Sequence, residues 1–318
     1  MRFVIPVQLK RFFATRFFPK SCTVRRALLL FLGSVGTCAI GISFLGCGHG
    51  LTEQDRIVGA RALTEAKALI ASHPNRDAGS HSLAAAQWIL SRLPKGTSTT
   101  GANPSLETFD TIRGKMANVR FDATPHPRAI IVSHFDTKSG IKNFVGANDG
   151  ASTTGLLIAL AQKTSLPVTY LFVDGEECFG ENYTATDGLH GSWHAAKSGV
   201  GKDSQGHEIP LIVLDMLGDS DFTPALAANG SPRLNAKLRR VAKEMGLTLA
   251  DAGEIIDDHL PFLSVGRQAA NIIDFEYGAS NAYWHTAEDT LDKLSADSLT
   301  KAAALVRRVL ELLEKENK

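Results

Sequence analysis

Residues 128–138, RAIIVSHFDTK, join a short apolar run to a polar end that carries His134 and Asp136. A short, largely β-branched run of this kind is typical of a strand covered on both faces, as in a parallel sheet. Residues 168–177, VTYLFVDGEE, repeat the arrangement and end in acidic residues. The two segments together indicate a buried sheet whose strands end in reactive side chains.

Apolar runs alternate with amphipathic stretches along the rest of the chain, which is the pattern of strands separated by helices. We expect strands at 116–121, 128–134, 168–174, 209–217 and 269–275, and helices near 55–71, 82–93, 152–164, 232–245 and 296–316. No internal repeat or low-complexity linker interrupts this part, so one domain over 51–318 is expected. The predicted fold class is α/β, with a central mixed, mainly parallel sheet flanked by helices.

Residues 1–50 differ in composition from the rest of the chain. They contain seven Lys or Arg and no acidic residue, whereas the remainder has 27 basic against 33 acidic residues. The uncharged, apolar segment 27–46 is long enough to cross a bilayer and follows Arg25 and Arg26. It ends at Cys47, in a context that resembles a bacterial lipoprotein cleavage site.

Three interpretations of this leader stay open, namely lipidation of Cys47, an uncleaved signal anchor and a buried core helix. The first two predict a membrane-associated protein outside the cytoplasm, in a bacterial envelope. A mildly acidic body behind a basic leader argues against nucleic-acid binding, which would need positive charge on the folded surface. Beyond Cys47 only Cys178 remains, so no disulfide is expected within the body, and Cys178 is interpreted as a packing residue.

Polar residues follow the predicted strands at their carboxyl ends. His134 and Asp136 follow one strand, Glu176 and Glu177 follow another, and Asp215 ends a third. In open α/β sheets the ligand crevice lies beyond these ends, so the side chains should converge. Buried carboxylates that lie near one another repel unless a cation or a proton compensates. Acids and histidines that converge in this way predict a metal site.

The candidate site residues fall in six clusters: SHFDTK (133–138), GANDGAS (146–152), DGEE (174–177), LDMLGD (214–219), DDHLPF (257–262) and WHT (284–286). Each cluster alone has an ordinary structural explanation, since a single His after a strand is often satisfied structurally and an acidic pair is often a solvated turn. Together they supply carboxylates and imidazoles suited to one or two zinc ions, from His134, Asp149, Glu177, Asp215 and His285.

The order of these clusters on an α/β body resembles the zinc-dependent aminopeptidase superfamily and its cyclase branch, the animal-type glutaminyl cyclases. The resemblance covers nearly the whole body, from RDAGSHSLAAAQWIL at 76–90 to WHTAEDTLDKL at 284–294. It implies a zinc exopeptidase-like fold. The two cysteines that often form a bridge in the animal enzymes are absent, which suggests a bacterial version without that disulfide.

The resemblance also implies the metal ligands. Asp149, Glu177 and His285 are expected to hold one zinc ion. His134 and Asp215, which hold a second zinc ion in the peptidases, leave room for one here.

The cyclase branch is favoured by Asp257 in DDHLPF and by Trp284 immediately before the last ligand. By the same resemblance, Glu176 is the catalytic acid and base, and Asp215 and Asp257 join it in a hydrogen-bonded acidic network. Trp284 would pack over the N-terminal residue of the substrate, with His134 as a further substrate contact. Cyclases commonly carry a Trp a few residues after the acidic pair, where this chain has GENYTATDGLHGS, and Tyr183 is the candidate substitute.

The function implied is glutaminyl-peptide cyclotransferase, which converts the N-terminal Gln of peptides or proteins to pyroglutamate and releases ammonia. The alternative is a zinc aminopeptidase that hydrolyses the N-terminal peptide bond, for which the same ligands would serve. A third interpretation, a metal-free binding domain, would require the loss of ligands, and none is missing from the sequence.

Overall fold

The computed structural model describes residues 50–95 and 103–316. By its internal contacts the chain divides after Gly46, and all the described residues belong to the second unit. The predicted leader segment 27–46 and Cys47 lie outside the described residues. Within the described ranges, no helix is both long enough and apolar enough to cross a membrane.

Eight strands of the described residues form one sheet in the order β1-β2-β4-β3-β5-β8-β6-β7. Their bounds are Ser105–Thr111 (β1), Gly114–Asp122 (β2), Ala129–His134 (β3), Val168–Val173 (β4), Leu211–Asp215 (β5), Ala225–Leu226 (β6), Ala250–Asp251 (β7) and Ala269–Ile273 (β8). The central strands β4, β3, β5 and β8 run parallel, whereas β2 and β6 join this centre antiparallel. The predicted α/β class with a mixed, mainly parallel sheet is confirmed.

All five strands expected from the sequence are present, with ends within two residues of the predicted ones. The sequence did not predict β1, β6 and β7. β1 is an edge strand in which only Phe109 is buried, so it lacks the apolar run that marks the central strands. β6 and β7 have two residues each, too few to leave a periodic pattern.

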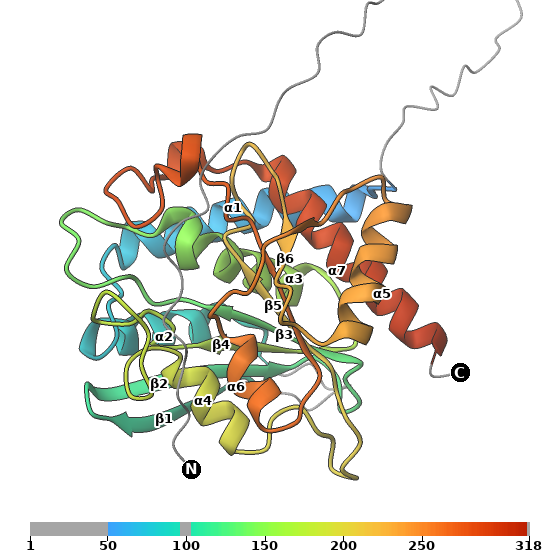
Figure 1. Cartoon of the computed structure of the whole chain (residues 1–318), viewed down its shortest axis with the longest axis horizontal. Helices are drawn as coiled ribbons and strands as arrows, with labels where there is room; N and C mark the ends of the chain where they lie inside the picture. Colours follow the sequence, from blue (N-terminus) through green and yellow to red (C-terminus); the bar gives the residue numbers. More distant parts are fainter. Residues whose placement is uncertain (1–49, 96–102, 317–318) are drawn as a thin grey trace, which may run out of the picture. The chain divides into compact units, whose positions relative to one another are not determined.

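The helices are Glu53–Ser72 (α1), Ser80–Arg92 (α2), Thr153–Lys163 (α3), His190–Lys197 (α4), Pro232–Glu244 (α5), His259–Ser264 (α6) and Ala296–Glu316 (α7). α1, α2, α3, α5 and α7 pack in one apolar cluster with the sheet, and α4 and α6 pack in another. Figure 1 shows these helices around the sheet. Consecutive residues of one strand point to opposite faces and belong to different clusters, as Ile130 and Ile131 do. The central sheet is therefore covered on both faces.

The buried carboxylate of Asp55 links the first helix to the last. It closes a capping box with Thr52 at the start of α1, and it accepts hydrogen bonds of 2.9 and 2.8 Å from the Arg307 guanidinium on α7. Burial alone would raise the pKa of Asp55, but the bonds from Arg307 and Thr52 outweigh it and lower that pKa below its usual value.

Asp55→Asn is expected to lower the free energy of unfolding by about 2 kcal/mol at neutral pH, because Arg307 loses its buried charged partner and keeps only the exposed Glu311. A lowered pKa in the folded state means that this contribution is present above the unfolded-state value and disappears as the pH falls through the folded-state value. Denaturant titrations at pH 7 and pH 3 should therefore show a smaller difference at pH 3. Asp297→Asn, which removes an exposed partner of Lys301, is the control and should change little.

Candidate metal centre and active site

Three neighbouring parallel strands have their carboxyl ends on the same side of the sheet, and polar residues lie at each of these ends. His134 is the last residue of β3, Asp215 is the last residue of β5, and Glu176 and Glu177 follow β4. Because β3 lies between β4 and β5, the side chains converge beyond the carboxyl ends of the strands.

Asp149 belongs to two groups of side chains, and within each group the ligand atoms all lie within 4.8 Å of one another. In the first group, His285 Nε2 lies 3.0 Å from Glu177 Oε1 and 3.3 Å from Asp149 Oδ2. In the second, His134 Nε2 lies 3.1 Å from Asp215 Oδ1 and 3.3 Å from Asp149 Oδ1. The structure therefore brings together all five residues that the sequence singled out as ligands.

These spacings suit a tetrahedral metal ion. Zinc-to-ligand bonds of about 2.0–2.2 Å that meet at tetrahedral angles put neighbouring ligand atoms roughly 3.4 Å apart. Asp149 Oδ2 and Glu177 Oε2 are buried and accept no hydrogen bond from the described residues, although a buried carboxylate oxygen needs a compensating partner. A cation would supply that partner, so the residues present fit a metal ion.

A distorted turn before α3 places Asp149. The segment η1, Ala147–Ser152, is kinked rather than regularly helical, because Asp149 at φ −80° and ψ 96° and Gly150 at φ 91° have non-helical backbone angles. The buried Asp289 anchors the turn, since one carboxylate oxygen accepts the Asn148 N–H at 2.8 Å and the other accepts the Asp149 N–H at 3.2 Å. No local pattern in the sequence indicates this role of Asp289.

Asp136 ties together the loops that follow β3 and β4. Its two carboxylate oxygens accept the backbone N–H groups of Glu176 and Glu177, each at 3.1 Å. Asp136 Oδ1 also lies 3.6 Å from His134 Nδ1. One carboxylate thus fixes the backbone of the acidic pair relative to the histidine at the end of β3.

The fully buried Arg76 holds the loop that leads into η1. Its guanidinium donates hydrogen bonds of 2.7 to 3.1 Å to the backbone oxygens of His73, Phe135, Val145 and Gly146. The charge of this buried cation also faces the acidic residues of the site. Arg76 begins one of the stretches that resemble the superfamily. The sequence does not predict the contacts of its guanidinium, because they depend on loops that only the fold brings together.

The acidic residues expected to form a hydrogen-bonded network are neighbours, but their hydrogen bonds lead elsewhere. Asp257 accepts a bond from Asn271, and Asp215 bonds with His134. Burial, and then the charge of Asp215, raises the pKa of Asp257 well above its usual value. Glu176 interacts with Asp257 through charge. The network is therefore electrostatic rather than a chain of direct hydrogen bonds.

Glu176 takes its side-chain hydrogen bond from Tyr183, whose hydroxyl donates to Oε1 at 2.7 Å. Burial, and then the charge of Glu177, raises the pKa of Glu176 well above its usual value. Burial and the charge of Glu176 raise the pKa of Tyr183 as well, so the phenol keeps its proton and acts as the donor.

Trp284 lies against the imidazole of His285. The two rings stack with centroids 4.0 Å apart and planes 20° apart, and Phe275 meets the indole edge-on at 4.9 Å. His285 has φ 52°. This left-handed backbone conformation is uncommon for residues other than glycine and recurs at functional sites. Trp284 keeps 37% of its surface exposed, so it can contact a bound ligand.

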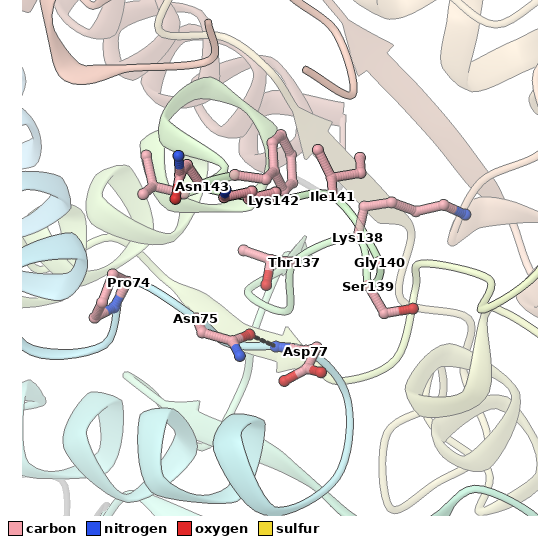
Figure 2. A pocket seen from close by; sticks show the side chains of 12 residues that line it. Pro74, Asn75, Asp77, Thr137, Lys138, Ser139, Gly140, Ile141, Lys142 and Asn143 are labelled. Atoms are coloured by element: carbon pink, nitrogen blue, oxygen red, sulfur yellow. Dashed lines mark hydrogen bonds between the residues drawn. The ribbon is translucent and has the colours of Figure 1, made fainter. Parts of the chain in front are cut away.

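A pocket of about 540 Å³ lies between segment 74–77 and the loop 137–145, as Figure 2 shows. Two of its lining residues also touch the metal centre. Lys138 Nζ is 3.9 Å from Glu177 Oε2, and the Phe144 ring meets the His285 ring edge-on at 6.1 Å. Two residues that line the pocket therefore lie next to candidate metal ligands.

The mixed sheet flanked by helices, with two groups of potential metal ligands beyond the carboxyl ends of its parallel strands, is the arrangement of a zinc exopeptidase-like fold. Residues 118–310 match Peptidase family M28, and the chain belongs to this family.

The chain is also similar to proteins that are named glutaminyl cyclases. A crystal structure of a glutaminyl cyclase from an Acidobacteriales bacterium has a TM-score of 0.69 and 32% identity, with 82% of this chain and 96% of that chain covered. The Drosophila melanogaster glutaminyl-peptide cyclotransferase is 27% identical over 62% of this chain, which spans 65% of that relative's length.

The same fold also occurs in proteins that are not named cyclases. A Zn-dependent exopeptidase from Parabacteroides distasonis has a TM-score of 0.64 at 20% identity, with 80% of this chain and 97% of that one covered.

Proposed function

We propose that the chain is a zinc-dependent glutaminyl-peptide cyclotransferase, which converts the N-terminal glutamine of peptides to pyroglutamate with release of ammonia. The observation that carries the proposal is the 32% identity with the Acidobacteriales glutaminyl cyclase across 96% of that chain. The stacking of Trp284 on His285 supports it, because an indole beside the metal centre helps to exclude water from a reaction that uses none.

In this proposal Asp149, Glu177 and His285 hold one zinc ion. A zinc ion held there would act as a Lewis acid that polarises the side-chain carbonyl of the glutamine. The second group of ligand atoms, with His134 and Asp215, shares Asp149 and leaves room for a second ion, so elemental analysis of the purified protein is expected to give one zinc ion per chain and at most two.

The nucleophile is the α-amine of the peptide itself, so ring closure is intramolecular and depends mainly on positioning. Glu176 accepts a proton from the amine as the new C–N bond forms. It returns that proton to the side-chain nitrogen, which leaves as ammonia when the old C–N bond breaks. Trp284 packs over the N-terminal residue, and the pocket that Lys138 helps to line (Figure 2) gives the following residues room.

Incubation of the zinc-loaded protein with the peptides Gln-Phe-Ala and Leu-Phe-Ala, followed by mass spectrometry, tests the proposal. We expect the first peptide to lose ammonia and the second to stay intact. Removal of the metal with a chelator should abolish the reaction, and added zinc should restore it.

The aminopeptidase alternative predicts the opposite pattern. Release of free Leu or Gln without any lactam would move the assignment to a hydrolase on the same scaffold. The presence of two ligand groups that share Asp149 is the observation that favours this alternative, because two-metal sites activate water in hydrolases.

A further inference from the structure

Tyr183 lies in the loop between β4 and α4, where the chain departs from the Trp that cyclases commonly carry. Its hydroxyl reaches the proposed acid and base, and donates a 2.7 Å hydrogen bond to Glu176 Oε1. A side chain that served only for packing would not need this contact. The position of this loop therefore determines a contact of the Glu176 carboxyl group.

Asp187 closes the base of the loop. Its two carboxylate oxygens accept the backbone N–H groups of Phe179 and Gly180, each at 3.0 Å. Arg113, on the turn between β1 and β2, pairs with the same carboxylate at 3.5 Å and lies over the Phe179 ring at 4.5 Å. The first residues of the loop are thus held against its end.

The Tyr183 ring packs directly against Gly188, where a larger residue would clash with it. Gly188 has φ 91°, and a Cβ atom there would come within 2.4 Å of Tyr183 Cδ1. The next residue, Leu189, donates its backbone N–H to the Glu176 carbonyl oxygen at 2.9 Å. The glycine leaves space for the ring, and the backbone bond ties the end of the loop to the residue that the phenol contacts.

We propose that Tyr183 is a positioning residue that fixes the Glu176 carboxyl group so that Oε2 exchanges protons with the reacting nitrogen atoms. The inference rests on the proposed role of Glu176. A hydrogen bond donated to Oε1 uses one lone pair of that oxygen and makes it less basic than Oε2, and it limits rotation of the carboxyl plane. The phenol keeps its own proton, while the transferred proton moves from the amine to Oε2 and then to the departing nitrogen.

Tyr183→Phe tests the inference in the full-length, zinc-loaded protein, because it removes the hydroxyl and keeps the ring. We expect kcat for Gln-Phe-Ala to fall roughly 10- to 100-fold, the range of one hydrogen bond to a charged group. KM, zinc content and Tm should be unchanged, because the ring still packs on Gly188. An unchanged kcat would overturn the inference.

Two further measurements separate positioning from a purely structural role. In the double variant Glu176→Gln/Tyr183→Phe, the tyrosine substitution should cause no further loss, because it acts through Glu176. If Tyr183→Phe lowers kcat by the same factor with and without Glu176→Gln, the inference is contradicted. It is also contradicted if the fall in kcat of Tyr183→Phe is accompanied by a lower zinc content or a lower Tm. Tyr283→Phe, which removes the hydroxyl of a tyrosine that packs against Tyr277, is the matched control and should retain its kcat.

Failure of the proposed function can be told apart from failure of this inference. If the wild-type protein releases free Leu from Leu-Phe-Ala and forms no lactam, the cyclase assignment is wrong. Glu176 would then serve as the general base of hydrolysis, and the same comparison of kcat between wild type and Tyr183→Phe would still test the positioning role. An unchanged rate of Leu release would overturn it.

Discussion

Glu176→Gln is expected to retain its metal and to lose roughly 10²- to 10⁴-fold in turnover, the usual contribution of a general acid and base. The amide has the same size, and its oxygen can still accept the hydrogen bond from Tyr183. It cannot, however, take a proton from the amine and return it to the leaving nitrogen. The rate with Gln-Phe-Ala, measured together with zinc per chain, checks both parts of this expectation.

Glu177→Gln provides the contrast, since the neighbouring residue has a different position. Glu177 Oε1 lies 3.0 Å from His285 Nε2, within the proposed ligand group, whereas Glu176 bonds with Tyr183. A neutral amide is a weaker ligand than a carboxylate, so this variant should lose zinc on dialysis. If the two variants show the same zinc content and the same rate, the division of roles within the acidic pair is wrong.

The central part of the fold could be predicted because burial leaves a local pattern. β3, β4, β5 and β8 are buried along their whole length, so each appears in the sequence as a continuous apolar run. β1 could not be predicted in this way, because it lies at the edge of the sheet and exposes most of its residues.

The residues of the two candidate ligand groups could be predicted to converge for a related reason. Each lies at a strand end or in a short polar cluster, and the parallel sheet brings these places together. The residues that hold them could not be predicted so simply. Arg76 acts through backbone oxygens about 60 to 70 positions away in the chain, and Asp289 through amides about 140 positions away. No local pattern marks such contacts.

Asp289→Asn is expected to weaken zinc binding roughly 10- to 100-fold, the usual effect of losing a group that orients a metal ligand. The buried carboxylate accepts one N–H from Asn148 and one from Asp149, and also the Tyr277 hydroxyl at 2.6 Å. An amide would turn an NH₂ group toward one of these donors. The η1 turn would then shift, and Asp149 belongs to both ligand groups.

Competition for zinc with a chelator of known affinity measures this effect directly, without reference to catalysis. Glu288→Gln, at the exposed neighbouring position, removes one carboxylate charge from the same segment and should leave zinc affinity nearly unchanged. If both variants bind zinc as the wild-type protein does, the η1 turn holds Asp149 without Asp289. A loss confined to Asp289→Asn would instead mean that the metal centre depends on a carboxylate that cannot itself reach the ion, because both of its oxygens are committed to the backbone that carries the ligand.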